Sequence, residues 1–201
     1  MRARDIMTSP VVTIRPEATI QAAAALLTDR GFTALPVVDE DDRLVGIVTE
    51  ADLVRDRILP DPRDHLRRER VPRAPSRSTV GEVMTSPAVA MSPGTDVAQL
   101  AAALLEARQR SMPIVDGSRL VGIVTRRDLV RVVGRSDTDI ARDVKHRLEI
   151  YGRPGRWTVQ VRDGVVTVGD EYDDATDGHV AVALAEAVPG VVRAEVSGPG
   201  G

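Results

Sequence analysis

Nine of eleven positions are identical between "RLVGIVTEADL" (residues 43–53) and "RLVGIVTRRDL" (residues 119–129). They differ at two adjacent positions, which are Glu-Ala in the first stretch and Arg-Arg in the second. Each begins with an apolar run typical of a buried strand and ends in a Thr-x-x-Asp pattern typical of a helix start. The chain therefore contains the same strand-to-helix junction twice.

The repeat extends beyond this junction. "DIMTSPVVTIRP" (residues 5–16) matches "EVMTSPAVAMSP" (residues 82–93), and "TALPVVD" (residues 33–39) matches "RSMPIVD" (residues 110–116), both at an offset of 77 residues. The offset is 76 at the Thr-x-x-Asp pattern, because the second copy has lost one residue in a turn, where such changes are tolerated. Two tandem copies therefore organise the first two-thirds of the chain.

Each copy predicts the same order of elements. A short extended piece comes before a proline and an Ala/Leu-rich helix, and two apolar strands joined by an Asp-rich or Asp-Gly turn then form a hairpin. A second helix starts at the Thr of Thr-x-x-Asp, and Leu53, Val54 and Ile58 keep helical spacing in the first copy. The expected extended pieces are 11–14 and 88–91, the expected first helices 20–30 and 97–108, and the expected strands 35–38, 44–49, 112–115 and 120–125.

Two tandem units with "MTSP", an "LPVVD" or "MPIVD" strand and a "GIVTxxDL" junction resemble a pair of CBS domains, a Bateman module. The resemblance implies an α/β (α+β) fold in which two β-α-β-β-α repeats, residues 1–57 and 80–134, pack as a pseudo-twofold pair. The Pro/Arg-rich segment 58–79 is expected to be a solvated linker with one helical turn near residues 64–70. Alternatively, Arg67, Arg68 and Arg70 meet ligand phosphates or an acidic partner.

A second, smaller domain is expected at residues 137–198. Apolar residues at 140, 144 and 148 indicate an amphipathic helix that Asp137 or Thr138 can cap. An alternating segment with an Asp-Gly turn at 163–164 predicts a hairpin, and a helix at 176–188 and a strand at 190–196 complete an αββαβ order. Residues 199–201 are expected to form a loose tail.

The hairpin pattern "V-x-V-x-x-G-V-V-T-V-x-G" and the "VPGV" before the last strand are similar to the BON domain. This resemblance implies contact with a protein partner or a membrane surface. The acidic stretch "GDEYDDATD" (residues 169–177) has the wrong sign for anionic lipid, and the chain starts without the apolar run of a secretory signal. A cytoplasmic location is therefore expected.

The composition argues against several classes of function. A net charge of −3 and 2% aromatic residues leave little for binding nucleic acid by charge or by base stacking. The chain has no cysteine, which excludes disulfides and thiolate metal sites. His65, His146 and His179 form no acid, base or metal constellation, and no catalytic motif is present, so the chain is expected to be neither an enzyme nor a metal-binding protein.

The two Thr-x-x-Asp patterns, Thr49 with Asp52 and Thr125 with Asp128, have two interpretations. Thr at the N-cap and an acid three residues later form a variant capping box, which stabilises a helix by about 1 kcal/mol. In addition, the first turn of a helix attracts phosphate, and a carboxylate one turn into the helix can accept both hydroxyls of a ribose. In CBS pairs the matching Thr contacts ribose or phosphate and the matching Asp binds the ribose diol. Because the pattern occurs twice, each time in a unit that resembles a CBS domain, the resemblance implies an adenine nucleotide site of the AMP, ADP, ATP or S-adenosylmethionine class.

The CBS resemblance implies that each cleft joins the Thr and Asp of one repeat to the backbone of the other. Arg126 and Arg127 could bind phosphates, Glu50 would repel them, and Arg110 is a further phosphate candidate. The expected walls are Pro87, Ala88, Val89, Ser111 and Met112 for Thr49 and Asp52, and Pro10, Val11, Val12, Ala34 and Leu35 for Thr125 and Asp128.

The resemblance also implies a homodimer, since CBS pairs commonly dimerise through the helices that flank their strands. Together these expectations describe a non-catalytic regulatory protein. A structural or envelope-associated interaction protein with no nucleotide ligand is the alternative.

Overall fold

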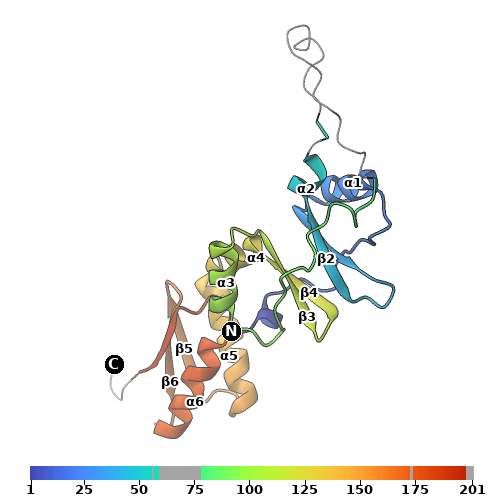
Figure 1. The fold of residues 1–201 in the computed structure, drawn as a ribbon. Coiled ribbons are helices and arrows are strands. Elements are labelled where there is room, and N and C mark those ends of the chain that lie inside the picture. Colours follow the sequence, from blue (N-terminus) through green and yellow to red (C-terminus); the bar gives the residue numbers. More distant parts are fainter. Residues whose placement is uncertain (56, 59–77, 173, 198–201) are drawn as a thin grey trace. The chain divides into compact units, whose positions relative to one another are not determined.

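The computed structural model describes residues 1–55, 57–58, 78–172 and 174–197 (Figure 1). The chain divides into two compact units, one made of Thr8–Pro93 with Ala103–Val124 and the other of Met1–Met7, Gly94–Ala102 and Thr125–Gly201. The expected linker turn at 64–70, with His65 and the linker arginines, and the tail at 199–201 lie outside the described residues.

The order of helices and strands repeats along the chain (Figure 1). After a short 3-10 helix, Ala3–Asp5, the first repeat contains α1 (Ile20–Arg30), β1 (Ala34–Val38), β2 (Leu44–Thr49) and α2 (Glu50–Val54). The second repeat contains α3 (Val97–Glu106), β3 (Ser111–Asp116), β4 (Arg119–Thr125) and α4 (Arg126–Val133). The C-terminal domain contains α5 (Asp137–Tyr151), β5 (Trp157–Arg162), β6 (Val165–Asp170), α6 (Ala175–Glu186) and β7 (Arg193–Val196).

The strands of each repeat pair as predicted, β1 with β2 and β3 with β4. The expected extended pieces are not strands, because each contributes a single parallel bridge, Ile14 to Val37 and Met91 to Ile114. Prolines at 10, 16, 87 and 93 bound these pieces, and proline donates no backbone hydrogen bond. The sheet therefore gains only one bridged residue at this edge.

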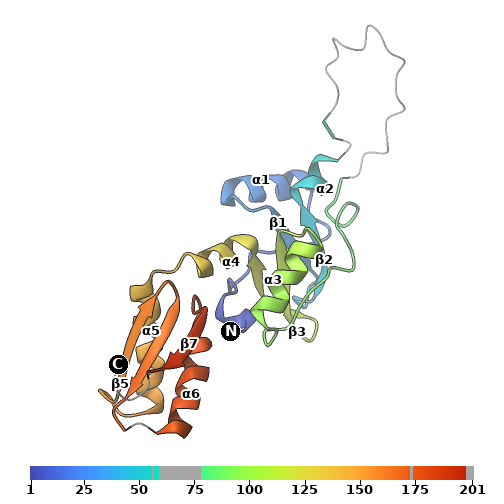
Figure 2. The same ribbon diagram turned by 90° about the vertical axis from the view of Figure 1, so that its left-hand side faces the viewer.

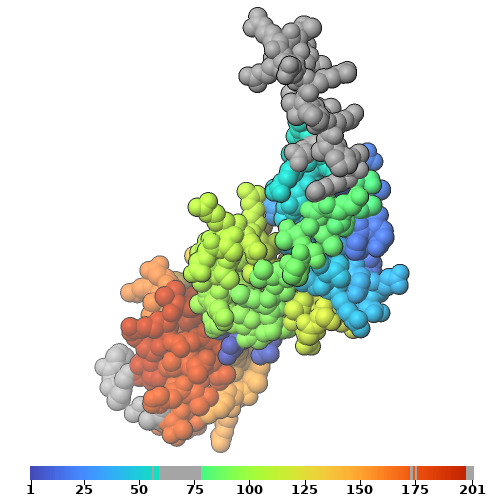
Figure 3. All heavy atoms as spheres, in the orientation of Figure 1, coloured from blue at the N-terminus to red at the C-terminus, as the bar shows by residue number. Residues whose placement is uncertain are grey.

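Each repeat also lends a residue to the hairpin of the other. The amide of Thr8 donates to the carbonyl of Ile123 at 2.9 Å, and Ile47 and Thr85 exchange two such bonds at 3.0 and 2.9 Å. In Figure 3 the green atoms that follow residue 78 lie against the blue atoms of the first repeat. Equivalent residues of the two repeats therefore pair with the two hairpins in the same way, as the sequence repeat predicts.

The core of the first repeat lies between its hairpin and its helices. All five residues of β1 are buried, and Leu35, Val37 and Val48 are fully excluded from solvent. They pack in one cluster with Ala23 and Leu27 of α1. Burying an aliphatic side chain of this size contributes roughly 1.5–3 kcal/mol. The apolar strand sequence thus has the expected cause, which is cover on both faces.

Two details differ from the sequence predictions. Helix α2 ends at Val54, because Arg55 turns to extended backbone (φ −55°, ψ 125°), so Ile58 lies outside it and is exposed. Helix α5 is capped by Ser136, whose hydroxyl accepts a bond from the Asp139 amide. Asp137 caps nothing, since its carboxylate accepts the amides of the hairpin turn at residues 163 and 164.

The C-terminal domain has the expected αββαβ order. Its sheet runs β5-β6-β7, with β5 and β6 antiparallel around a turn at Asp163 and Gly164 whose φ angles are positive. Helices α5 and α6 cover one face of the sheet (Figure 2). The buried core beneath them is formed by Ile140, Val144, Leu148, Trp157, Val166, Val168, Ala181, Ala185, Val188 and Ala194.

An ion-pair network that the sequence analysis missed ties β5, β6 and α6 together. Arg156 donates two hydrogen bonds of 2.7 Å to Asp170, whose side chain is 1% exposed, and contacts Asp177 at 2.6 Å. Its guanidinium lies 4.5 Å from the centre of the Trp157 ring. The hydrogen bonds from Arg156 lower the pKa of the Asp170 carboxyl to about 2. The acids at 170 and 177 are thus structural in this domain.

Candidate functional site: the repeated Thr-x-x-Asp junction

The first junction stands where β2 ends and α2 begins. Asp52 Oδ2 accepts hydrogen bonds from the Thr49 amide at 2.9 Å and the Thr49 hydroxyl at 2.7 Å. The Asp52 amide donates to the Thr49 hydroxyl at 3.4 Å, which completes a capping box. The capping interpretation is therefore confirmed for this junction.

The second junction repeats this arrangement almost atom for atom. Asp128 Oδ2 accepts the Thr125 amide at 2.8 Å and the Thr125 hydroxyl at 2.7 Å. The second junction differs from the first in an added hydrogen bond, which Arg131 donates to Asp128 Oδ1 at 3.1 Å. Asp128 is also only 5% exposed. The second carboxylate is therefore more buried and more fully bonded than that of Asp52, which is half-buried.

Hydrogen bonds between the repeats bring part of the predicted first wall beside β2. The Thr85 backbone pairs with Ile47, and the Ser86 hydroxyl donates to the Val45 carbonyl at 2.8 Å. Pro87, Ala88 and Val89 follow directly, and the Val89 side chain is 58% exposed. Ser111 and Met112 are buried at the start of β3, with 6% and 1% of their surface exposed.

An ion pair joins the two repeats at the same place. Arg110, which directly precedes β3, lies 3.6 Å from Glu50, the first residue of α2. Both side chains are more than half exposed, at 69% and 53%. The structure therefore pairs the predicted phosphate candidate with the acid that is expected to repel phosphate, a contact that the sequence analysis did not foresee.

The residues predicted for the second cleft fall into both compact units, and each set is described by itself. Thr125, Asp128, the half-buried Arg126 and the exposed Arg127 belong to one unit. In the other unit Ala34 and Leu35 are buried, Val11 and Val12 are half-buried, and Pro10 is exposed. This gradient matches the wall of the first cleft, with an exposed proline and buried strand residues. The joining of the two sets into a nucleotide cleft stays a prediction.

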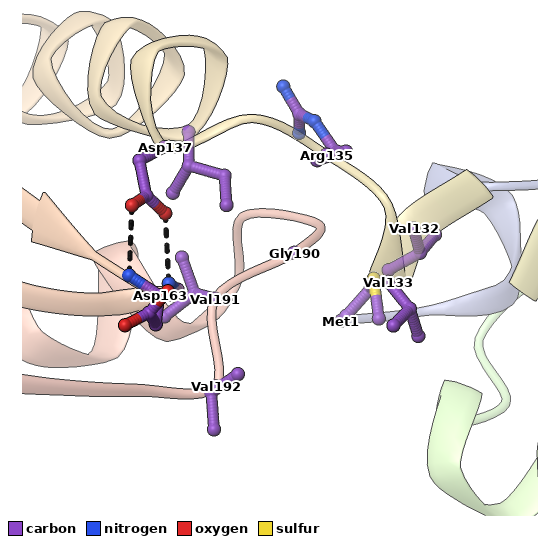
Figure 4. Close-up of a pocket in the computed structure, with 11 residues that line it drawn as sticks. Met1, Val132, Val133, Arg135, Asp137, Asp163, Gly190, Val191 and Val192 are labelled. Atoms are coloured by element: carbon purple, nitrogen blue, oxygen red, sulfur yellow. Dashed lines mark hydrogen bonds between the residues drawn. The ribbon is translucent and has the colours of Figure 1, made fainter. Parts of the chain in front are cut away.

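A separate open hollow of about 520 Å³ contains none of these residues (Figure 4). The carboxylate of Asp137 beside it is occupied by the turn amides at 2.8 and 2.9 Å, and Val133 and Val192 are exposed at its edge. An open hollow whose Asp137 carboxylate is already bonded and whose edge carries exposed valines offers little to hold a polar ligand. We therefore place the candidate site at the Thr-x-x-Asp junctions.

Neither metal binding nor membrane spanning is indicated in the described part of the chain. It contains no group of three or more His, Asp or Glu side chains that could hold a metal ion. His146 and His179 are exposed on α5 and α6. Among the same residues no helix is long and apolar enough to cross a bilayer.

The fold and the paired junctions define a tandem module in which each repeat contributes one bridged residue to the hairpin of the other. The family model for the CBS domain matches residues 3–58 and 80–135, more than half of the chain. The chain therefore belongs to the CBS domain family, and the resemblance seen in the sequence is confirmed for the repeats. The BON resemblance of the C-terminal domain stays a prediction.

Relatives share the repeat region. The uncharacterized protein MJ1404 of Methanocaldococcus jannaschii is 31% identical over 150 residues, which are 73% of this chain and 34% of that protein. A 33.4 kDa protein of Thermofilum pendens is 34% identical over 64% of this chain and 38% of its own length. Hypoxic response protein 1 of Mycobacterium tuberculosis is 29% identical over 64% of this chain and 82% of its own length. The chain thus spans little more than a third of the first two relatives.

Solved structures match the same region. The CBS pair of protein MJ0100, solved with 5-methylthioadenosine and S-adenosyl-L-methionine, is 28% identical with a TM-score of 0.53 and covers 67% of this chain and 96% of its own. CBSX2 in complex with AMP is 28% identical with a TM-score of 0.54 and covers 65% of this chain and 93% of its own. These neighbours share the fold of the repeats and were solved with adenosine compounds.

Proposed function

We propose that this protein is a non-catalytic regulatory module whose CBS pair binds an adenine nucleotide or S-adenosylmethionine. In this proposal Asp52 and Asp128 hold ribose hydroxyls, and Thr49 and Thr125 lie near the 5′ substituent. The observation that carries the proposal is the exact repetition of the Thr-x-x-Asp junction in both repeats. Each repeat adds two aliphatic segments that suit an adenine ring, Pro87–Val89 and Ser111–Met112 in the first cleft and their counterparts in the second.

One carboxylate oxygen of Asp52 accepts no hydrogen bond from the described part of the chain, which supports this role. Within the described part of the chain its hydrogen bonds all go to Oδ2, so Oδ1 can accept a hydroxyl without breaking the capping box. A ribose diol presents two donors at the spacing of one carboxylate, and hydrogen bonds to a charged acceptor stabilise by roughly 1.5–3 kcal/mol. The capping box and the nucleotide role are therefore compatible.

The ligands of similar proteins support the class of compound. CBSX2 was solved with AMP, and the MJ0100 pair was solved with 5-methylthioadenosine and S-adenosyl-L-methionine. All three compounds contain adenosine and differ in the 5′ substituent. We propose the same class of compound for this chain, with adenine as the common part.

A thermal-shift panel tests the proposal. A ligand that binds only the folded state adds about 2.7 kcal/mol at a hundredfold excess over its Kd. For about 200 residues this raises the melting temperature by roughly 5–10 °C. We expect AMP, ADP, ATP or S-adenosylmethionine to give such a rise and guanosine compounds to give none. If no adenosine compound moves the transition, the nucleotide proposal fails.

The completed capping boxes favour one other candidate function, a structural interaction protein with no nucleotide ligand. In that case Thr49 and Asp52 serve α2 alone, and the C-terminal domain carries the activity, as an envelope-associated domain. Liposome flotation separates the candidates. The structural role is favoured if the full chain is recovered with anionic vesicles at physiological salt and no adenosine compound changes its melting temperature.

The remaining parts of the proposal concern partners and location. We propose a homodimer, for which the exposed apolar residues Val54 on α2 and Val130 on α4 (51% and 70% exposed) are candidates to be covered. We assign the C-terminal domain to the BON family and give it contact with a protein or membrane surface, in the cytoplasm. Light scattering at micromolar protein should return about twice the 21.6 kDa chain mass, and a monomer mass contradicts the dimer.

A further inference from the structure

We propose that Glu50 determines which 5′ substituent the first cleft accepts. It disfavours nucleoside di- and triphosphates and favours adenosine derivatives with a neutral or cationic 5′ group, such as a thioether or a sulfonium. The inference rests on the proposed function, since it concerns the ligand of the same cleft. It concerns a position at which the two repeats carry opposite charges.

The proposed function puts Thr49 near the 5′ substituent, so the side chain of the following residue, Glu50, is the first charge beyond it. It is the residue next to Thr49, and its amide donates to the Thr33 carbonyl at 3.2 Å, which fixes the backbone of this turn. Its carboxylate lies 3.6 Å from Arg110, the cation nearest to the predicted wall at Ser111. Glu50 and Arg110 come from different repeats, so their ion pair joins the two sides of the proposed first cleft.

The ion pair removes the positive charge that a phosphate needs. A phosphate that binds Arg110 must either displace the Glu50 carboxylate or lie beside it within a few ångströms. Each further phosphate adds negative charge at the same place, so the penalty grows from AMP to ADP to ATP. A neutral thioether is not repelled by the Glu50 carboxylate, and a positively charged sulfonium is attracted to it.

The helix that follows does little to offset this repulsion. α2 contains five residues, fewer than two turns, so its aligned peptide dipoles are few. Side-chain charge therefore decides the preference of the first cleft. The second repeat carries Arg126 and Arg127 where the first carries Glu50 and Ala51, and its helix α4 has eight residues. The two junctions thus share their Thr–Asp hydrogen bonds and differ in the charge of the residues that follow the Thr.

The test compares full-length chains by isothermal titration calorimetry with adenosine, AMP, ADP and ATP. We expect Glu50→Gln to raise affinity for ATP about two- to fivefold, the range that a single exposed charge pair contributes, and to leave affinity for adenosine unchanged. Glu50→Arg, which introduces the residue type of the second repeat, should raise affinity for ATP further. Because the second cleft is the same in all these chains, a change in the ratio of ATP to adenosine affinity reports the first cleft.

Two controls make the result specific. Glu40→Gln removes the same charge from an exposed turn of the same repeat, and it should leave the ratio unchanged. Arg110→Gln added to Glu50→Gln should abolish the gain in ATP affinity. The inference is overturned if adenosine binds but Glu50→Gln leaves the ratio unchanged, or if Glu40→Gln gives the same gain. If neither adenosine nor any nucleotide binds any of the chains, the proposed function falls with it.

Discussion

Asp128 accepts a hydrogen bond from Arg131 at 3.1 Å, whereas in the described part of the chain no such bond joins the corresponding Arg55 to Asp52. The two junctions are otherwise alike, because both acids cap their helices through the same oxygen. The difference follows from the backbone, since Arg55 leaves the helical conformation and Arg131 stays within α4. Asp52 therefore has the more available carboxylate oxygen, and we expect the first cleft to depend more strongly on its aspartate.

Replacing this aspartate tests that expectation. Asp52→Ala should lower affinity for adenosine compounds about ten- to a hundredfold, because charge-assisted hydrogen bonds contribute roughly 1.5–3 kcal/mol. It should also cost about 1 kcal/mol of stability in the absence of ligand, through loss of the cap. Calorimetric titration with AMP measures the first effect, and thermal unfolding without ligand measures the second.

A matched cap separates the two effects. Asp174 caps α6 by accepting the amides of Thr176 and Asp177, far along the chain from both junctions. Asp174→Ala should lower the melting temperature to a similar degree and leave the rise caused by nucleotide intact. An Asp52→Ala chain that behaves in the same way would show that the Thr-x-x-Asp junction is a cap and nothing more.

The buried ion pair of the C-terminal domain should carry much of that domain's stability. Asp170→Asn leaves the Arg156 guanidinium without its main partner in a site that is 14% exposed, and breaking a pair of this kind costs about 3 kcal/mol. Trp157 is the single tryptophan of the chain and lies against Arg156, so its fluorescence during urea unfolding reports this domain. The exposed pair of Arg193 and Glu195 provides the control, since Glu195→Gln should cost at most about 1 kcal/mol.

The same pair predicts how stability depends on acid. Hydrogen bonds from Arg156 lower the pKa of Asp170 from 3.8 to about 2 in the folded domain. Because the folded pKa is the lower one, the stabilisation is complete above about pH 4 and is lost as the pH falls through about 2. Urea midpoints followed by Trp157 fluorescence should therefore decrease from pH 4 to pH 2, and Asp170→Asn should flatten this decrease. Equal slopes in the two chains would assign acid sensitivity to other groups.

Much of the fold follows from local sequence signals. The helix predicted at about residues 20–30 matches α1, which Thr19 caps at its start and Gly31, with a φ of 63°, ends. The hairpin turn at Asp163 and Gly164 was predicted by its dipeptide, and both residues adopt positive φ. Strong caps and turn dipeptides are local chemistry, which a sequence displays directly.

Contacts between distant residues could not be predicted in this way. Nothing local to Arg156 indicates that it meets Asp170 and Asp177 across three elements. The pairing of Glu50 with Arg110 likewise depends on how two repeats exchange residues. Asp137 or Thr138 was expected to cap α5, but Ser136 is the cap and Asp137 binds a turn 26 residues away. In each case a charged side chain had several possible partners, and tertiary packing selected one of them.

The exchange of residues between the repeats gives a last prediction, at Gly46. A Cβ placed on Gly46 would lie 2.6 Å from Met84 Sδ and 3.0 Å from the Thr85 carbonyl oxygen, which accepts the Ile47 amide. The Met84 side chain can move, but the carbonyl is held by that bond, so Gly46→Ala should cost about 1–3 kcal/mol. Circular dichroism during thermal unfolding measures this loss, and Trp157 fluorescence should not follow it. The control is Gly134→Ala. Its Cβ would lie 3.4 Å from the nearest neighbour, the Val130 carbonyl oxygen, so this substitution should leave stability nearly unchanged. Equal melting temperatures for wild type and Gly46→Ala would mean that the two repeats do not hold each other through Ile47 and Thr85.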